Sequence, residues 1–204
     1  MTYKYAASRV VRPMTDKPQH PPPMDLDGAR LRPLRAADVS ALYAYLRDPV
    51  VTEFTSYPVV TVPMVEAMIE RSVSRWAAGD LSKWGIALRD DDQIIGTCGF
   101  NEWSRVHRWA ELAFDLAAAH WGTGRMRQAV GAVLQWVYGH DLVDRVHAYV
   151  RVDNRRSERF CERTGFVREG RLRSYRVCRG QPHDFYIYSL LRADWAAARP
   201  AVEG

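Results

Sequence analysis

Two glycines stand where an apolar, strand-like run gives way to a segment of helical period. Gly122 and Gly124 lie between the run that ends near Ala117 and the segment that begins near Met126. A glycine turn at the start of a helix presents free backbone N–H groups and the positive end of the helix dipole. A side chain at these positions would block an approaching anion. The turn therefore predicts a phosphate site, although a glycine pair before a helix is also a routine tight turn.

Acidic side chains precede this turn at strand spacing. Because side chains alternate along a strand, Glu111, Ala113 and Asp115 share one face, and the apolar residues between them share the other. Two carboxylates on one face indicate acid–base chemistry. The alternative is a pair of exposed strand carboxylates that bind neighbouring arginines.

Other chemical motifs are missing from the sequence. It has no GxxxxGK[ST] run, and Arg127 replaces the third glycine of a dinucleotide fingerprint. It also has no GxSxG or HExxH. The cysteines Cys98, Cys161 and Cys178 are widely spaced and the histidines do not cluster. We therefore expect neither a metal site nor a disulfide framework.

The hydrophobic period predicts the elements that must position these residues. Helices are expected over 39–47, 62–78 and 126–138, with a short helix from Asn154 to Gly165. Asp90 to Asp92 form an acidic turn, most simply a solvated one. Pro33 confines the first expected strand to an edge or a bulge. Strands are expected near 29–35, 83–89, 93–100, 108–117, 145–152, 166–176 and 183–191.

Length and composition fit one folded domain. The 204 residues are 47% hydrophobic and carry a net charge of +5, which excludes a wholly disordered chain. The prolines of residues 1–24 predict a flexible extension, followed by a single domain over 25–195 and a tail over 196–204. No window is apolar enough for a membrane span or a signal peptide, so we expect a cytoplasmic protein that does not bind membranes.

The positive charge is concentrated in the second half of the chain. Eleven arginines against four acidic residues lie between Arg145 and Arg179. A solvated surface, a phosphate-bearing cofactor and a nucleic acid each account for this excess.

The stretch Trp121 to Met126 resembles the acyl-CoA-binding turn of the GCN5-related N-acetyltransferase (GNAT) superfamily, in the RimJ/RimL-like branch of ribosomal-protein-alanine N-acetyltransferases. The resemblance covers about residues 26–195. Met126 departs from the small residue usual at the end of the turn. Supporting motifs follow the family order: Ala110 to Leu116, Asn154 to Ser157, Thr164 to Gly170, His183-Asp184 and Tyr188 to Leu191.

The resemblance implies an α/β (α+β) GNAT fold. Its central, mixed and mostly antiparallel twisted sheet would have about seven strands and about four helices. The sheet would splay between the fourth and fifth strands, which end near Leu116 and Val152, and acetyl-CoA (coenzyme A) would bind in the gap.

The resemblance also assigns cofactor-binding residues. The pyrophosphate would bind backbone amides of the turn, the pantetheine arm would pair with backbone beyond the strand, and Asn154 would donate a further hydrogen bond. Arginines such as Arg125, Arg155, Arg156 or Arg159 would meet the phosphates of the cofactor. The expected cofactor-binding positions besides Asn154 are Leu116, Ala117, Ala118, Trp121, Gly122, Thr123, Gly124, Arg125 and Met126.

The implied reaction is the direct transfer of an acetyl group to a primary amine in a ternary complex. The acceptor would be a protein N-terminus or a small-molecule amine. Glu111 or Asp115 would take the proton of the amine, because a free amine is mostly protonated at neutral pH. Ser157 would protonate the departing thiolate, or it would only satisfy backbone amides at the start of its helix.

Two other functions stay open. One is a non-catalytic descendant that binds acyl-CoA. The other is a nucleic-acid-binding module that uses the Arg-rich C-terminal half, although no recognised motif accompanies the arginines and nucleic acid is not the expected partner. The sequence is compatible with a monomer or a homodimer.

Overall fold

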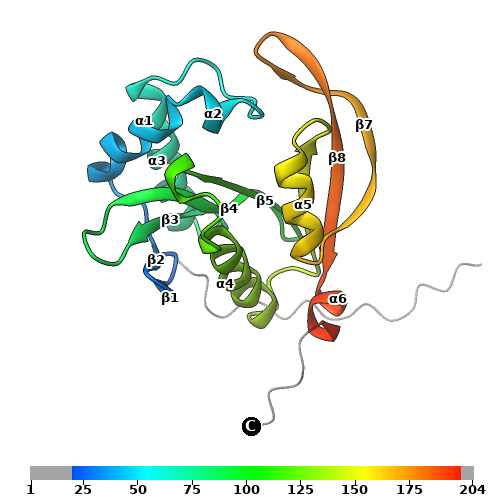
Figure 1. Cartoon of the computed structure of the whole chain (residues 1–204). Helices are drawn as coiled ribbons and strands as arrows, with labels where there is room; N and C mark the ends of the chain where they lie inside the picture. The colour runs from blue at the N-terminus through cyan, green and yellow to red at the C-terminus, as the bar shows by residue number, and fades with distance from the viewer. Residues whose placement is uncertain (1–19, 199–204) are drawn as a thin grey trace, which may run out of the picture.

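A single mixed sheet runs through the described part of the chain, residues 20–198 of this computed structural model (Figure 1). Its strand order is β1-β2-β3-β4-β5-β6-β8-β7. Every neighbouring pair is antiparallel except β5 and β6, which confirms the expected mixed, mostly antiparallel sheet. The strands are β1 (Met24–Leu26), β2 (Ala29–Arg32), β3 (Lys83–Leu88), β4 (Ile94–Ser104), β5 (Trp109–Leu116), β6 (Arg145–Arg151), β7 (Val167–Cys178) and β8 (Gln181–Leu191).

The sheet has eight strands rather than the seven expected, because β1 forms at the end of the proline-rich stretch. The rest of that stretch, residues 1–19, and residues 199–204 of the expected tail lie outside the described residues. Pro33 does not make β2 an edge strand, since β2 ends at Arg32 and lies between β1 and β3.

Six α-helices are present among the described residues, two more than expected. The extra helices, α2 and α6, have only 4 and 6 residues, too few to show a helical period. Thr61 caps α3, because its hydroxyl accepts a hydrogen bond from the Met64 amide. The helices are α1 (Val39–Leu46), α2 (Pro49–Thr52), α3 (Val62–Ala77), α4 (Arg125–Gly139), α5 (Arg155–Arg163) and α6 (Arg192–Ala197), with 3-10 turns at Ala36–Asp38 and Ala118–His120.

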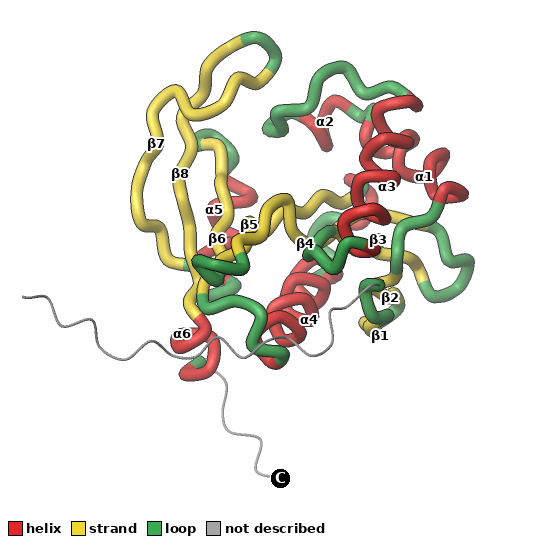
Figure 2. Tube along the Cα trace, turned by 180° about the vertical axis from the view of Figure 1, so that it is seen from behind, coloured by secondary structure: helices red, strands yellow, loops and turns green. Residues whose placement is uncertain are grey.

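Two apolar clusters fix the helices on opposite faces of the sheet. Ile86 belongs to the cluster under α4, whereas its neighbour Ala87 belongs to the cluster under α1 and α3, as strand alternation requires. Figure 2 shows α1 and α3 side by side, apart from α4. Trp84 of β3 joins α3 to α4, because its ring meets those of Trp76 and Trp136 at 4.7 and 5.5 Å.

The sheet is split between β5 and β6. These parallel strands pair only at their starts, from Trp109 with Arg145 to Glu111 with His147. Within the described chain, the rest of β5 up to Leu116 has no strand on its β6 side. The predicted splay, between the fourth and fifth of the expected strands, is therefore confirmed as a gap between β5 and β6. In Figure 1 the β7–β8 hairpin and the α1–α2 segment stand on opposite sides of this gap.

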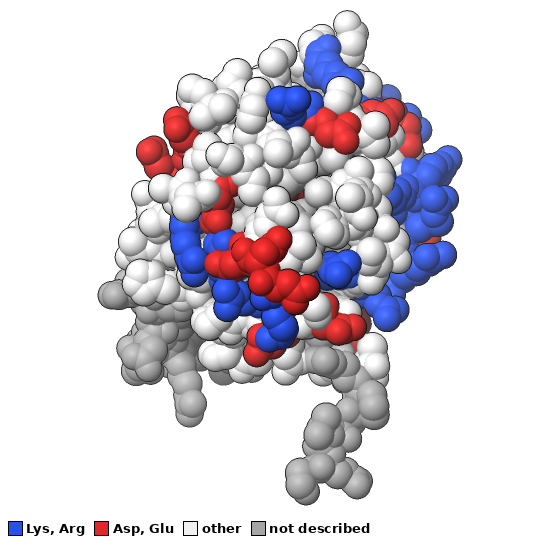
Figure 3. All heavy atoms as spheres, turned by 60° about the vertical axis from the view of Figure 1, so that its left-hand side comes forward, with Lys and Arg blue, Asp and Glu red and all other residues white. Residues whose placement is uncertain are grey.

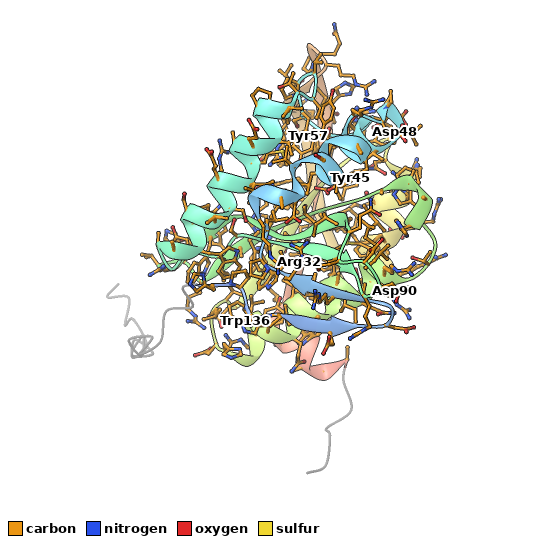
Figure 4. The ribbon with its side chains drawn as sticks, turned by 90° about the vertical axis from the view of Figure 1, so that its left-hand side faces the viewer. Arg32, Tyr45, Asp48, Tyr57, Asp90 and Trp136 are labelled. Atoms are coloured by element: carbon orange, nitrogen blue, oxygen red, sulfur yellow. The ribbon has the colours of Figure 1, made fainter. Side chains whose placement is uncertain are left out.

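The acidic turn is not simply solvated. Asp92 accepts hydrogen bonds from Arg30 at 2.9 Å, Arg32 at 2.7 Å and Arg35 at 3.1 Å. Arg32 is only 3% exposed and also pairs with Asp38 at 2.8 Å. Its buried guanidinium needs carboxylates on both sides. Figure 3 shows acidic and basic side chains in contact on this face, and Figure 4 labels Arg32 and Asp90.

Many of the clustered arginines are paired inside the chain. Five of the eleven bind a carboxylate at 3.1 Å or less, and Arg168 lies 3.8 Å from Glu158. The other five make no ion pair with described residues: Arg156, Arg159, Arg163, Arg173 and Arg179. The five close pairs are Arg145–Glu169, Arg151–Asp153, Arg155–Glu158, Arg171–Asp184 and Arg176–Glu111.

The helices of residues 20–198 are all too short or too polar to cross a bilayer.

Candidate active site

A cavity of about 1120 Å³ occupies the split in the sheet. It reaches from the start of α4 and α5 on one side to α3 and the segment after α2 on the other. The part of β5 from Glu111 to Leu116 lines it, as do Tyr149 and Val150 of β6. The cavity is therefore bounded by the two strands that separate.

The glycine turn forms one wall of the cavity. Gly122 and Gly124 have φ of 77° and 81°, values that L side chains rarely adopt. A Cβ atom built on either glycine would meet no described atom within 4 Å and would point into open space. Gly124 begins α4, and no side chain of the described residues caps that helix. The first amides of α4 are thus free for an anion, which fits a diphosphate.

Arg125 holds an unsatisfied polar atom beside this turn. Its Nε atom is buried and has no hydrogen-bond partner among the described residues. Arg125 nevertheless does not line the cavity, and neither does Thr123, whose hydroxyl donates to the His120 carbonyl at 2.8 Å. Burial and the charge of Arg125 lower the pKa of His120.

Trp121 connects the glycine turn to the end of β5 through a hydrogen bond. Its indole N–H donates to the Leu116 carbonyl at 2.8 Å, and the Arg156 guanidinium lies 3.4 Å from its ring centroid. The Ala117 amide donates to the Ile95 carbonyl at 2.8 Å. Backbone groups expected to pair with a pantetheine arm are therefore already bonded within the chain. Of the expected cofactor-binding residues the cavity is lined by Leu116, Trp121, Gly122, Gly124, Met126 and Asn154, but not by Ala117, Ala118, Thr123 or Arg125.

The start of α5 places a hydroxyl in the same cavity. The Asn154 side chain accepts a hydrogen bond from the Ser157 amide at 3.1 Å, so Asn154 caps the helix. Because Asn154 is the cap, the Ser157 hydroxyl is not needed for it. The hydroxyl makes no hydrogen bond with other described residues, and Ser157 lines the cavity.

Glu111 is a buried carboxylate on the opposite wall. It is 5% exposed, and Oε1 accepts hydrogen bonds from Asn101 Nδ2 at 3.0 Å and from Arg176 at 3.1 Å. Arg176 lies within 6 Å of the ring centroids of Tyr149, Tyr175 and Phe185. Burial lowers the pKa of this guanidinium, but Glu111 outweighs burial and raises it. Glu111 is thus no simple solvated strand carboxylate.

Asp115 faces the same cavity but is fully engaged. Its carboxylate accepts hydrogen bonds from the Tyr45 hydroxyl at 2.5 Å and from the Thr97 hydroxyl at 2.8 Å and amide at 3.1 Å. Burial and the neighbouring Asp115 charge raise the pKa of Tyr45 well above its ordinary value. Asp115 therefore joins α1, β4 and β5.

Lys83 and Tyr57 complete this wall, and sequence reasoning missed both. Burial lowers the pKa of Lys83, but Tyr57 and Asp115 outweigh burial and raise it, so Lys83 is a fixed positive charge. Lys83 lowers the pKa of Tyr57, whereas burial and Asp115 raise it more. Figure 4 shows Tyr45 and Tyr57 on adjoining segments of the chain. Neither Lys83 nor Tyr57 belongs to a motif, and no local signal marks them.

The cysteines offer no nucleophile. All three are free and buried, and only Cys161 lines the cavity. Burial raises the pKa of Cys161 to about 12, so it is a neutral thiol.

A split mixed sheet with an uncapped glycine turn at one end of the gap and a buried carboxylate across it fits an acyltransferase that binds a phosphorylated cofactor. The family model described as "Acetyltransferase (GNAT) domain" matches residues 29–167. The chain belongs to this family, whose acetyl donor is acetyl-CoA, and the resemblance to it is confirmed.

Two curated relatives agree with this assignment. The uncharacterized N-acetyltransferase p20 of Bacillus licheniformis is 30% identical over 81% of this chain and 94% of its own length. The ribosomal protein uS5-alanine N-acetyltransferase of Escherichia coli is 27% identical over 59% of this chain and 63% of its own length.

Two solved structures share the fold. The ribosomal-protein-S5-alanine acetyltransferase from Vibrio fischeri has a TM-score of 0.77 at 19% identity, over 88% of this chain and 100% of that one. The self-immunity acetyltransferase MccE, solved with acetyl-CoA and AMP, has a TM-score of 0.74 at 22% identity, over 81% and 93%.

Proposed function

We propose that the chain acetylates a primary amine by direct transfer in a ternary complex. The observation that carries the proposal is the position of Glu111, a buried carboxylate in the wall of a cavity that also holds the glycine turn and Ser157. The relatives named above include an alanine N-acetyltransferase of ribosomal protein uS5, which supports an amine acceptor.

Glu111 takes the proton of the acceptor amine. It is a better candidate for this role than Asp115, because Asp115 already accepts three hydrogen bonds from Tyr45 and Thr97. Glu111 keeps one carboxylate oxygen, Oε2, without a hydrogen bond to any described residue. Asn101 and Arg176 hold the other oxygen and fix the orientation of the group.

Ser157 delivers a proton on the opposite side of the gap. Its hydroxyl has no partner in the described chain, and the start of α5 is capped by Asn154, which accepts from the Ser157 backbone amide. Bound acetyl-CoA supplies the acetyl group as a thioester. The Ser157 Oγ–H then donates to the sulfur that departs.

The residues that hold the cofactor are the free amides of the Gly122–Gly124 turn and the backbone of β5 after Glu111. We place the pantetheine arm along residues 112–116 rather than 116–118, since that part of β5 lacks a strand partner on the β6 side of the described sheet. Arg156, Arg159 and Arg163 line the cavity and suit the phosphates.

Calorimetric titration with acetyl-CoA, followed by thiol release with a panel of amines, tests the proposal. The expected result is saturable binding and release of one thiol for each amine acetylated. Protein that binds no acetyl-CoA contradicts the proposal. Tight binding with no thiol release from any amine indicates a non-catalytic acyl-CoA-binding descendant instead.

A nucleic-acid-binding function has less support. Six of the eleven arginines of the Arg-rich segment pair with carboxylates among the described residues, as Arg145 does with Glu169 and Arg171 with Asp184. These six are already engaged within the fold and are less free to bind a phosphate backbone.

A further inference from the structure

The cavity wall is far more basic than acidic. Eight Arg and Lys residues but only three carboxylates line it. Four of the cations, Arg127, Arg156, Arg159 and Arg163, belong to α4 and α5 beside the glycine turn, where the cofactor phosphates bind. The other four lie at the acceptor end: Arg71, Arg75, Lys83 and Arg176.

The carboxylates of the acceptor end do not offset these charges. Asp115 is bound by Tyr45 and Thr97, and Glu111 is bound by Asn101 and Arg176. Glu102 is the third, and its charge acts on Arg75. Three carboxylates against four cations leave this end with a net charge of +1.

Arg71 carries the unmatched charge. It lies one turn before Arg75 on α3, so both side chains share a face of that helix. Arg75 donates a hydrogen bond to the Asn101 carbonyl and is thereby oriented, whereas Arg71 makes no hydrogen bond or ion pair within residues 20–198.

Lys83 lies where β3 packs against the same helix, and it lines the same cavity. The Lys83 carbonyl accepts hydrogen bonds from Ser72 at 3.0 Å and from Trp76 at 3.2 Å, residues next to Arg71 and Arg75. A polyamine or aminoglycoside would bring more positive charge to this wall and find no free carboxylate pair to bind.

We propose that the acceptor is a small primary amine that also carries an anionic group, a carboxylate or a phosphate, and that Arg71 binds this group. The proposal rests on the proposed function and names its substrate class. Arg75 and Lys83 favour the anion through their charge, while the amine approaches Glu111. An anionic acceptor would neutralise the net positive charge of the acceptor end.

Matched dipeptide amides test the acceptor charge with the same N-terminal alanine. Because Ala-Lys-NH2 carries a second primary amine on its lysine side chain, this probe is compared by binding alone. The probes are Ala-Glu-NH2, Ala-phosphoserine-NH2, Ala-Gln-NH2 and Ala-Lys-NH2. Their binding to the CoA-loaded protein is measured by calorimetry, and kcat/KM is measured by thiol release at saturating acetyl-CoA. We expect the anionic peptides to bind about tenfold more tightly than Ala-Gln-NH2 and to show a correspondingly higher kcat/KM. Ala-Lys-NH2 should bind most weakly. The stronger of the two anionic probes identifies the anion as carboxylate or phosphate.

Charge reversal at Arg71 provides the decisive variant. Arg71→Glu should reverse the order so that Ala-Lys-NH2 binds best, and its exposed position makes misfolding no obstacle. Arg173→Glu, on the exposed face of β7 outside the cavity, should keep the original order.

Two outcomes separate this inference from the proposed function. Equal binding of Ala-Glu-NH2, Ala-phosphoserine-NH2 and Ala-Gln-NH2, or an order that Arg71→Glu leaves unchanged, overturns the anion site even if thiol is released. The expected order of binding without any thiol release sustains the anion site and overturns the catalytic proposal.

Discussion

The guanidinium of Arg176 lies 3.1 Å from Oε1 of Glu111, and the two residues are 65 positions apart in the chain. The β7–β8 pairing shifts register between Leu172 and Arg176, and Arg176 lines the cavity. The proposed base is therefore held by a strand on the far side of the split. The β7–β8 hairpin is thereby part of the active site.

Glu111→Gln should lower kcat by about 10²- to 10⁴-fold and change KM little, because the amide keeps the shape but cannot take a proton. Steady-state thiol release measures both constants. Asp115→Asn is the matched comparison and should act on stability, since Asp115 joins Tyr45 to Thr97. A larger loss of kcat in Asp115→Asn would transfer the role of base to Asp115.

Arg176→Met should lower kcat and change the KM for acetyl-CoA little, because the Glu111 carboxylate loses a hydrogen bond that orients it. Steady-state thiol release measures both constants. Arg173→Met, on the same strand but outside the cavity, should leave kcat unchanged. If Arg176→Met only lowers Tm and kcat stays the same, Arg176 is structural.

Ser157→Ala should reduce kcat by about tenfold or more while the affinity for acetyl-CoA stays the same, because only proton delivery to the leaving sulfur is lost. Asn154 retains its bond to the backbone amide at this position, so α5 keeps its cap. Circular dichroism melting checks the fold. Turnover equal to that of the wild type removes Ser157 from the proposed machinery.

Gly124→Glu should abolish acetyl-CoA binding in calorimetry. The new side chain would occupy the open space over the turn, bring a negative charge to the phosphate site and strain a residue at φ 81°. Gly131→Ala on the same helix meets no described atom within 4 Å. This control should bind normally and gain up to about 1 kcal/mol of stability. Normal binding by Gly124→Glu would place the phosphates elsewhere.

Asp92→Asn should destabilise the fold at neutral pH by about 2 kcal/mol, because it weakens charged hydrogen bonds to the buried Arg32. Burial raises the pKa of Asp92, but Arg30 and Arg32 outweigh it and lower the pKa to about 2. The stability that the ionised Asp92 contributes is thus present above its ordinary pKa of 3.8 and is lost as the pH falls from there to about 2. Urea titrations at pH 7 and pH 2.5 measure it. If Asp92→Asn lost the same free energy of unfolding at both pH values, the stabilising role of the Asp92 carboxylate would be contradicted.

The sequence predicted the parts of the fold with strong local signals. The helical period of α4 runs from Met126 to Tyr138, and all seven of its apolar positions are buried. The sequence did not predict three short elements: α2 with four residues, α6 with six and β1 with three. Elements of this length are too short to show a hydrophobic period.

By itself, the sequence determined the family, the order of the elements and the glycine turn, because each depends on residues that are neighbours in the chain. Only the tertiary structure decided how the charges are matched. In the folded chain Glu111 pairs with Arg176, and Asp115 accepts a hydrogen bond from Tyr45. Arg71 has no hydrogen-bond or ion-pair partner among the described residues. Such pairings join residues far apart in the chain, and no local period or motif encodes which charge meets which when the sheet closes around the cavity.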